Sequence, residues 1–263
     1  WDTDYVWKLS SIAMPTLVMG SIEPNGVSGD YFRKDLTLQE INSTESFKTK
    51  FSQNLENELI KLVEDVDLSS GWTPVSLTNC TIDGNGKTIK VNLNNAVDNY
   101  LGLFTKLDNC AIKNLNIEVV GVSANATYVG ALAGEITSSS ELTESSIQNV
   151  NVKYLTETAA ITATQFGGLV ASVQKTSVNN VKVEGLTVNA NANIENVGGI
   201  ASTLAGNVRT VEVSATLSGT TNIGGAVANL TSGSLTEVLA NITINHTKAG
   251  ENAQVGGLVA INN

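Results

Sequence analysis

The chain repeats a short apolar pattern that is interrupted by glycine. In each copy a large apolar residue is followed by one or two glycines, another apolar residue and then small residues. Self-similarity at a period of about 30 residues is typical of solenoid proteins, in which successive repeats stack on one another. The copies are Leu101-Gly102-Leu103-Phe104, Val129-Gly130-Ala131-Leu132, Phe166-Gly167-Gly168-Leu169, Val197-Gly198-Gly199-Ile200, Ile223-Gly224-Gly225-Ala226 and Val255-Gly256-Gly257-Leu258.

A second pattern follows each of the first five copies, in the order apolar, two polar, apolar, any, apolar. Its apolar positions are Ile112, Leu115 and Ile117; Ile147, Val150 and Val152; Val178, Val181 and Val183; Val208, Val211 and Val213; and, more weakly, Leu235, Val238 and Ala240. Each repeat therefore holds two stretches rich in Val and Ile, joined by turns of Ser, Thr, Asn and Gly, which is typical of β-strands. Neither stretch is long enough for a helix-based repeat.

These repeats predict an all-β fold. A single repeat cannot bury its own apolar face, whereas stacked repeats pair each strand with its equivalent above and below. We expect a right-handed parallel β-helix, a solenoid of about six to seven coils of roughly 30 residues with about three strands per coil and an N-terminal α-helical cap. The predicted inward column is Phe104, Leu132, Leu169, Ile200, Ala226 and Leu258.

Three asparagines occupy equivalent positions in successive repeats, namely Asn114, Asn149 and Asn180. One interpretation is an asparagine ladder, in which the side-chain amides bond to one another along the solenoid axis. The alternative is three ordinary turn asparagines. The sequence leaves both open.

Residues 42–57 have the pattern of an amphipathic helix, because Phe47, Phe51 and Leu55 lie four residues apart on one face. Asn42 and Glu45 have the spacing of a capping box, with Asn in place of the usual Ser or Thr. The first coil of a solenoid exposes both its core and a strand edge. We therefore expect this helix to cover the N-terminal end.

Two regions are predicted. Residues 1–30 carry no repeat pattern and form a separate N-terminal segment, either the tail of a preceding repeat array or a strap along the solenoid. Residues 31–263 form the β-helix, with strand-like sequence at 59–68 after the helix. Because the chain begins at Trp1 without a signal peptide and stops just after a repeat copy, we expect it to be part of a longer protein.

Composition and charge exclude some classes of function. Hydrophobic residues make up 41% and charged residues 15% of the chain, which is enough apolar material for a sizeable core and argues against disorder. The formal net charge of −10, with no cluster of Lys or Arg, would repel nucleic-acid phosphates and anionic membrane surfaces. No apolar run approaches about 18 residues. We expect no nucleic-acid partner and no membrane insertion within this chain.

The residues that carry chemistry form no catalytic or metal motif. The single histidine, His246, excludes sites with several His ligands and is interpreted as a surface turn residue. Asp83-Gly84-Asn85-Gly86 lacks the spaced acidic ligands of a calcium loop and is interpreted as a tight turn between strands. Arg209, the only Arg inside the repeats, has no acidic cluster beside it in the sequence. We predict no catalytic site, no cofactor and no metal site, and the sequence identifies no ligand-binding residues.

Two cysteines stand at matching positions of adjacent repeats. Leu77-Thr78-Asn79-Cys80-Thr81-Ile82 aligns with Leu107-Asp108-Asn109-Cys110-Ala111-Ile112. Their Cα atoms are therefore expected about 5 Å apart, which permits a disulfide without requiring one. Stacked buried thiols are the alternative, and both interpretations remain open.

Several segments resemble the GLUG-motif repeat family of bacterial cell-surface proteins. The matching segments are Leu62-Val63-Glu64-Asp65-Val66-Asp67-Leu68, Trp72-Thr73-Pro74-Val75, Ile82-Asp83-Gly84-Asn85-Gly86-Lys87-Thr88-Ile89, Gly102-Leu103-Phe104 and Ile112-Lys113-Asn114-Leu115. Trp7-Lys8-Leu9 with Pro15-Thr16-Leu17 is similar to the element that often closes such an array. The resemblance covers about 59–263. It implies a secreted or surface-anchored protein of Bacteroidetes type, often called an adhesin, with no shared catalytic residues.

Two functions follow as expectations. The first is a noncatalytic adhesin or structural binding scaffold at the cell surface or secreted, whose partner is a host or cell-surface protein or glycan. The second is a polysaccharide-binding or polysaccharide-cleaving β-helix, which requires convergent carboxylates for hydrolysis and a groove of aromatic and acidic residues. The repeat region offers few aromatic residues for such a groove, namely Tyr100, Tyr128, Tyr154 and Phe166.

Overall fold

The computed structural model describes the chain except for residues 1–6, 10–14, 18–36, 141–143 and 247–252. The chain divides into two compact units, Trp1–Thr37 and Leu38–Asn263, so the division falls slightly later than the one expected near residue 30. In the first unit, strands β1 (Trp7–Leu9) and β2 (Pro15–Leu17) pair in antiparallel order. The rest of the predicted 1–30 segment lies outside the described residues.

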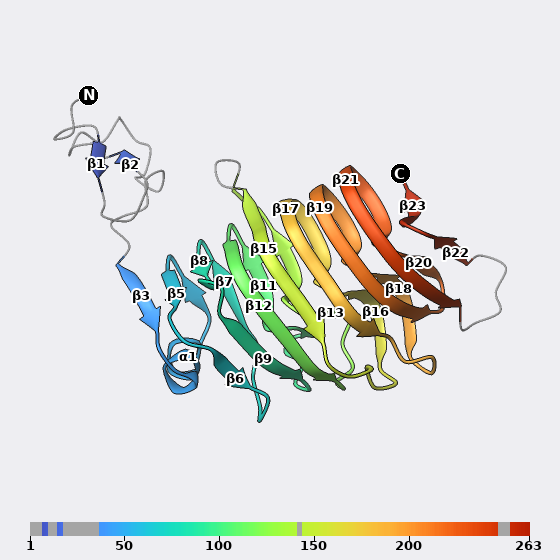
Figure 1. Cartoon of the computed structure of the whole chain (residues 1–263), viewed down its shortest axis with the longest axis horizontal. Helices are drawn as coiled ribbons and strands as arrows, with labels where there is room; N and C mark the ends of the chain where they lie inside the picture. Colours follow the sequence, from blue (N-terminus) through green and yellow to red (C-terminus); the bar gives the residue numbers. More distant parts are fainter. Residues whose placement is uncertain (1–6, 10–14, 18–36, 141–143, 247–252) are drawn as a thin grey trace. The chain divides into compact units, whose positions relative to one another are not determined.

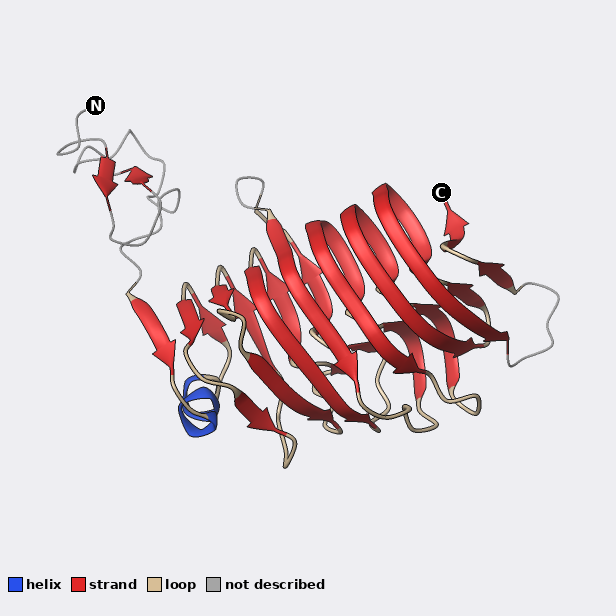
Figure 2. Cartoon of the chain, in the orientation of Figure 1, coloured by secondary structure: helices blue, strands red, loops and turns tan. Residues whose placement is uncertain are grey.

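The second unit confirms the predicted all-β fold. The chain is 66% strand and 3% helix, and parallel sheets form a β-solenoid of about six turns (Figures 1 and 2). Strands of successive coils pair in register, so residues about 30 positions apart become neighbours across the sheet. This register brings together the distant side chains of the columns described below.

One side of the solenoid is a six-stranded parallel sheet in the order β10-β13-β16-β18-β20-β22. Its members are β10 (Tyr100–Leu101), β13 (Tyr128–Gly130), β16 (Thr162–Gly167), β18 (Asn193–Gly198), β20 (Asn222–Gly224) and β22 (Gln254–Gly256). These strands carry the starts of the glycine-containing copies, so the repeat seen in the sequence is the repeat of this sheet.

The other sides belong to a fifteen-stranded sheet. Its members are β3 (Leu38–Ile41), β4 (Leu55–Glu56), β5 (Leu59–Leu62), β6 (Val66–Leu68), β7 (Val75–Thr78), β8 (Thr81–Asp83), β9 (Thr88–Leu93), β11 (Phe104–Asp108), β12 (Ala111–Val122), β14 (Ala133–Thr137), β15 (Ser145–Tyr154), β17 (Val170–Thr187), β19 (Ala201–Gly219), β21 (Val227–His246) and β23 (Val259–Asn262). Middle coils contain three strands each, such as β13, β14 and β15, as predicted. In later coils one long strand takes the place of the second and third strands. For example, β17 pairs with both β14 and β15 of the preceding coil.

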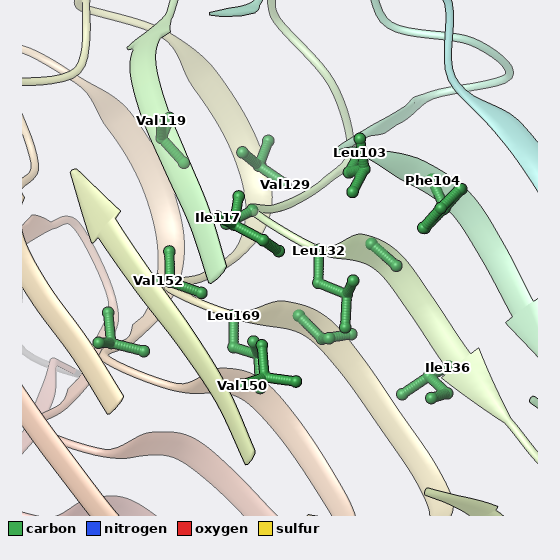
Figure 3. Close-up of a cluster of buried hydrophobic side chains, with 14 of the residues drawn as sticks. Leu103, Phe104, Ile117, Val119, Val129, Leu132, Ile136, Val150, Val152 and Leu169 are labelled. Carbon is green, nitrogen blue, oxygen red and sulfur yellow. The ribbon is translucent and has the colours of Figure 1, made fainter. Parts of the chain in front are cut away.

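The core is a stack of apolar side chains that point into the solenoid (Figure 3). All the predicted inward residues from Phe104 to Ala226 are buried, at most 1% exposed. The column itself is confirmed for Leu132, Leu169, Ile200 and Ala226, whereas Phe104 pairs with Ala133 and so lies one position away from it. Leu258 differs, because 44% of its surface is exposed. It lies between β22 and β23, which pair with β20 and β21 of the preceding coil.

The paired glycines lie where the backbones of adjacent coils approach closely. A Cβ atom added at Gly199 would stand 2.3 Å from the carbonyl oxygen of Gly225 in the next coil. At Gly257, in the last coil, an added Cβ would meet nothing within 4 Å. The glycine at 199 is therefore required by coil stacking rather than by its own backbone angles.

The predicted helix is shorter than expected. Helix α1 spans Thr44–Lys50, and its capping box is formed by Ser43 and Ser46 rather than by Asn42 and Glu45. The Ser43 hydroxyl accepts from the Ser46 amide at 3.1 Å, and the Ser46 hydroxyl accepts from the Ser43 amide at 3.0 Å. The capping residue is therefore Ser43, one residue after the predicted Asn42, and the helix begins at Thr44.

The helix also ends earlier than the spacing of its apolar residues suggested. Phe47, Phe51 and Leu55 are all buried, but Leu55 lies in β4, where it pairs with Leu77. Leu55, which was predicted as a helical residue from its spacing to Phe51, thus belongs to a strand. Phe47 and Phe51 pack into the aromatic core, with ring centroids 5.3 Å from Trp72 and 5.7 Å from Phe104 respectively. The role of α1 as a cap stays a prediction.

Candidate functional site

The predicted asparagine ladder is confirmed. The Asn149 amide donates to Asn114 Oδ1 at 2.9 Å, and the Asn180 amide donates to Asn149 Oδ1 at 2.8 Å. At the N-terminal end, Asn114 donates to Asp83 Oδ1 at 3.0 Å. The three asparagines have φ values of 53° to 54°, in the left-handed region that asparagine tolerates better than most residues. The three residues lie within β12, β15 and β17, so the alternative of ordinary turn asparagines is wrong.

The column continues with other residues after the asparagines. Thr210 and Glu237 occupy the next two positions, again with positive φ, and the Thr210 hydroxyl donates to Glu237 Oε2 at 2.7 Å. Arg209 Nη2 lies 3.4 Å from Glu237 Oε1. The Thr210 hydroxyl and the Arg209 guanidinium hold the pKa of Glu237 below its ordinary value. An acidic partner for Arg209 therefore exists in space although none adjoins it in sequence.

Beside the ladder lies an exposed surface of β12, β15, β17 and β19 that we call the outer polar face. It consists of two register-matched columns, namely Asn116, Asn151, Lys182 and Glu212, and Glu118, Lys153 and Glu184. Asn151 donates to Asn116 Oδ1 at 3.0 Å. Lys182 Nζ lies 3.0 Å from Glu184 and 4.0 Å from Glu212. Six of these seven residues, all except Glu212, line a shallow hollow of about 340 Å³, and Thr88, Ile117 and Val152 complete its lining.

The two cysteines lie in one buried column, as the alignment predicted, and both are free thiols in this structure. Cys80 Sγ lies 3.2 Å from the Thr78 carbonyl oxygen and Cys110 Sγ 3.2 Å from that of Asp108. Hydrogen bonding with Cys80 and burial together raise the pKa of the Cys110 thiol well above its ordinary value. Such a thiol is a poor nucleophile at neutral pH.

The run at 83–86 is a tight turn, as predicted, between β8 and β9. Asn85 and Gly86 have φ values of 52° and 73°, and the Lys87 amide donates to the Gly84 carbonyl at 2.8 Å. Positive φ at both central residues is what a type I′ turn requires, which explains the Asn-Gly pair. Asp83 accepts from the Asn85 amide at 2.9 Å, so its carboxylate is occupied within the turn.

His246 is exposed, as predicted, but it lies at the end of β21 rather than in a turn. Its Nε2 atom lies 3.1 Å from the Thr220 carbonyl oxygen of the preceding coil. Among the residues that the structure describes, no group of three or more His, Cys, Asp or Glu side chains is placed to hold a metal ion.

The four aromatic residues considered for a groove do not form one together. Tyr154 and Phe166 are buried, and the Tyr154 hydroxyl donates to the Gly168 carbonyl at 2.9 Å. Tyr100 and Tyr128 stack on each other with ring centroids 4.9 Å apart. Glu135 accepts from the Tyr100 hydroxyl at 3.3 Å, so one acidic side chain does adjoin this stack.

A further feature carries no signal in the sequence. A cavity of about 420 Å³ lies between α1, the turn after β6 and the segment after β9. Its residues come from three separate stretches with no shared motif, and they include Lys48, Trp72 and Asn95. Only the fold brings them together.

Comparison with protein-family models and with curated proteins found no match to this chain. The resemblance to GLUG-motif repeats therefore stays a proposal. Within the described residues, no helix has the length and apolar character needed to cross a membrane.

Proposed function

We propose that this chain is a noncatalytic repeat scaffold of a bacterial cell surface, an adhesin or structural module that binds a host or cell-surface macromolecule through the outer polar face. The observation that carries the proposal is the register of that face. It repeats amide and charged side chains from coil to coil, at the spacing of about 4.8 Å between paired strands.

The support beneath this face is stiff. Each outward residue on β12 and β15 alternates with a side chain buried in the core, such as Ile117 and Val152. The asparagine ladder stabilises the neighbouring corner through direct hydrogen bonds between side-chain amides of successive coils. A preorganised surface loses little conformational entropy when a partner binds, so modest individual contacts add up to useful affinity.

The chemistry of the face suits a polar partner. Lys153 lies between Glu118 and Glu184 in one column, so positive and negative groups alternate along the axis. Asn116 and Asn151 add both amide donors and carbonyl acceptors. An extended protein segment or a glycan chain presents the same mixture of donors and acceptors. Placement at the cell surface is supported by the resemblance of residues 59–263 to surface repeats.

A binding array tests this proposal. The intact chain is applied to arrays of glycans and host-matrix proteins, and the affinity of each hit is then measured for the double variant Lys153→Ser with Lys182→Ser. We expect saturable binding that the double variant weakens about tenfold, since both lysines donate charge-assisted hydrogen bonds to the partner. Lys175→Ser, which changes an exposed lysine outside the face, is the matched control and should leave affinity unchanged. The proposed surface would be contradicted if no ligand bound, or if the double variant bound each ligand with unchanged affinity.

A further inference from the structure

The cavity beside α1 has fixed walls. The Trp72 indole nitrogen donates to the Leu103 carbonyl at 2.7 Å, which holds the ring at the edge of the core. Asn95 Nδ2 donates to Thr73 Oγ1 at 3.0 Å and so joins the two walls of the cavity. Gly71 lies among the lining residues, and a Cβ there would meet nothing within 4 Å. The opening is therefore kept clear by a residue that has no side chain.

The size of the cavity is that of a small-molecule site. Its volume of about 420 Å³ falls toward the lower end of the range of about 300–1,000 Å³ that ligand pockets occupy. One side is apolar, since buried Phe51 and Trp72 line it. The other side carries the exposed side chains of Ser52, Thr73 and Asn94. A ligand with one apolar face and several hydroxyl groups matches this division.

The charge of the cavity contrasts with that of the chain. The chain carries a net charge of −10, yet Lys48 is the charged residue among the lining residues and no carboxylate is among them. Asp67 lies near enough for Lys48 to help lower its pKa, after the larger effects of the Ser69 hydroxyl and amide. The same Asp67 oxygen accepts from both of those Ser69 groups, at 2.5 Å and 2.9 Å. Lys48 is thus the charged group that lines the cavity, and Asp67 is a neighbouring carboxylate outside the lining.

We propose that this cavity binds a carboxylated sugar, either a uronic acid or a sialic acid, with Lys48 pairing with the carboxylate. The hydroxyl and amide groups of Thr73, Ser52 and Asn94 then bond to ring hydroxyls, and the apolar side receives a C–H face of the ring. A neutral hexose would satisfy the same hydroxyl contacts but would offer no anionic group to Lys48. This inference goes beyond the proposed function, because it does not depend on whether the outer polar face binds a macromolecule.

Titration calorimetry of the intact chain with galacturonic acid, N-acetylneuraminic acid and galactose tests the proposal. We expect at least one acid to bind about tenfold more tightly than galactose, because a charge-assisted hydrogen bond is stronger than a neutral one. Lys48→Gln should remove that preference, Lys48→Arg should retain it, and Lys175→Gln should change nothing. The acid that binds identifies which class of carboxylated sugar fits.

Three outcomes would overturn the proposal: equal affinity for galactose and both acids, no binding of either acid, or a preference that survives Lys48→Gln. A thermal unfolding midpoint that is the same in Lys48→Gln and the unchanged chain shows that the variant is folded. The double variant Lys153→Ser with Lys182→Ser separates the two proposals. It should weaken macromolecular binding on the outer polar face and leave sugar binding intact.

Discussion

The side-chain amide of Asn149 donates to the side-chain oxygen of Asn114 at 2.9 Å, although 35 residues separate them in the chain. The bond exists because the two residues hold the same corner in adjacent coils, each in a left-handed conformation. One residue type thus satisfies two demands at once. It accepts the backbone angle that the corner requires, and its amide both donates to the coil before and accepts from the coil after.

Substitutions at the middle of the ladder separate these two demands. Asn149→Ala removes both amide bonds and replaces Asn by a residue that tolerates positive φ less well, so we expect it to lower the free energy of unfolding by about 2–3 kcal/mol. Asn149→Gly removes the bonds but tolerates the angle, so its loss should be smaller by about 1 kcal/mol. Urea unfolding monitored by circular dichroism measures both. Equal losses in the two variants would show that the backbone angle contributes nothing.

The fold was predictable because each repeat contains two independent sequence patterns that indicate β-strands. The glycine-containing copies mark one sheet and the Val/Ile pattern marks another, and burial of Leu132 and Val150 on the same interior follows from both. The asparagine ladder was predictable as a possibility, since equal spacing places Asn114 and Asn149 in one column. Its completion was not, because rotamers and hydrogen-bond partners depend on the stacking distance between coils.

Coil stacking also predicts opposite outcomes for two glycines. Gly199→Ala would place a Cβ 2.3 Å from the Gly225 carbonyl oxygen and 2.6 Å from a Val213 methyl carbon. We expect a loss of stability of about 3 kcal/mol or more, at the upper end for overpacked sites. Gly257→Ala is the matched control, because its Cβ would meet nothing within 4 Å, and it should be close to neutral. Comparable melting temperatures for the two variants would argue against this stacking.

The buried thiols predict a pattern of labelling. Both cysteines are fully buried, and hydrogen bonding with Cys80 together with burial raises the pKa of Cys110. Iodoacetamide should therefore leave the native chain unmodified and alkylate both cysteines after unfolding without reductant. Mass spectrometry reads the number of added groups. Failure to label the unfolded chain until a reductant is added would show a disulfide instead.

Asp83, at the N-terminal end of the ladder, predicts an acid dependence. Burial alone would raise its pKa, but hydrogen bonds from Asn114 and the Asn85 amide, together with the Lys113 ammonium, hold the pKa below its ordinary value. A carboxyl with a lower pKa in the folded state adds stability that is complete above its unfolded pKa of about 3.9 and is lost as the pH falls through the folded value.

The isosteric variant Asp83→Asn tests this dependence. It keeps an oxygen acceptor for Asn114 and for the Asn85 amide, but it does not titrate. The difference in unfolding free energy between the two proteins should be constant near neutral pH and shrink below about pH 4. A difference that stays unchanged into strong acid would mean that the Asp83 charge does not stabilise the fold.

The end of helix α1 and the cavity beside it could not be predicted from the sequence, because tertiary contacts determine both. The spacing of Phe51 and Leu55 fits a helix, but pairing of Leu55 with Leu77 stabilises a strand instead, so tertiary contacts override the local pattern. The cavity joins Lys48, Thr73 and Asn95, and only the Asn95–Thr73 hydrogen bond and the packing of α1 determine that they face one another.

The claim that the chain binds without catalysing is tested most directly by the fate of its ligand. Each array hit is incubated at saturating concentration with the intact chain, and the ligand is then analysed by size-exclusion chromatography with mass detection. We expect a bound ligand of unchanged mass after prolonged incubation. Fragments that accumulate with time and in proportion to the chain would contradict it, and they would identify the chain as an enzyme.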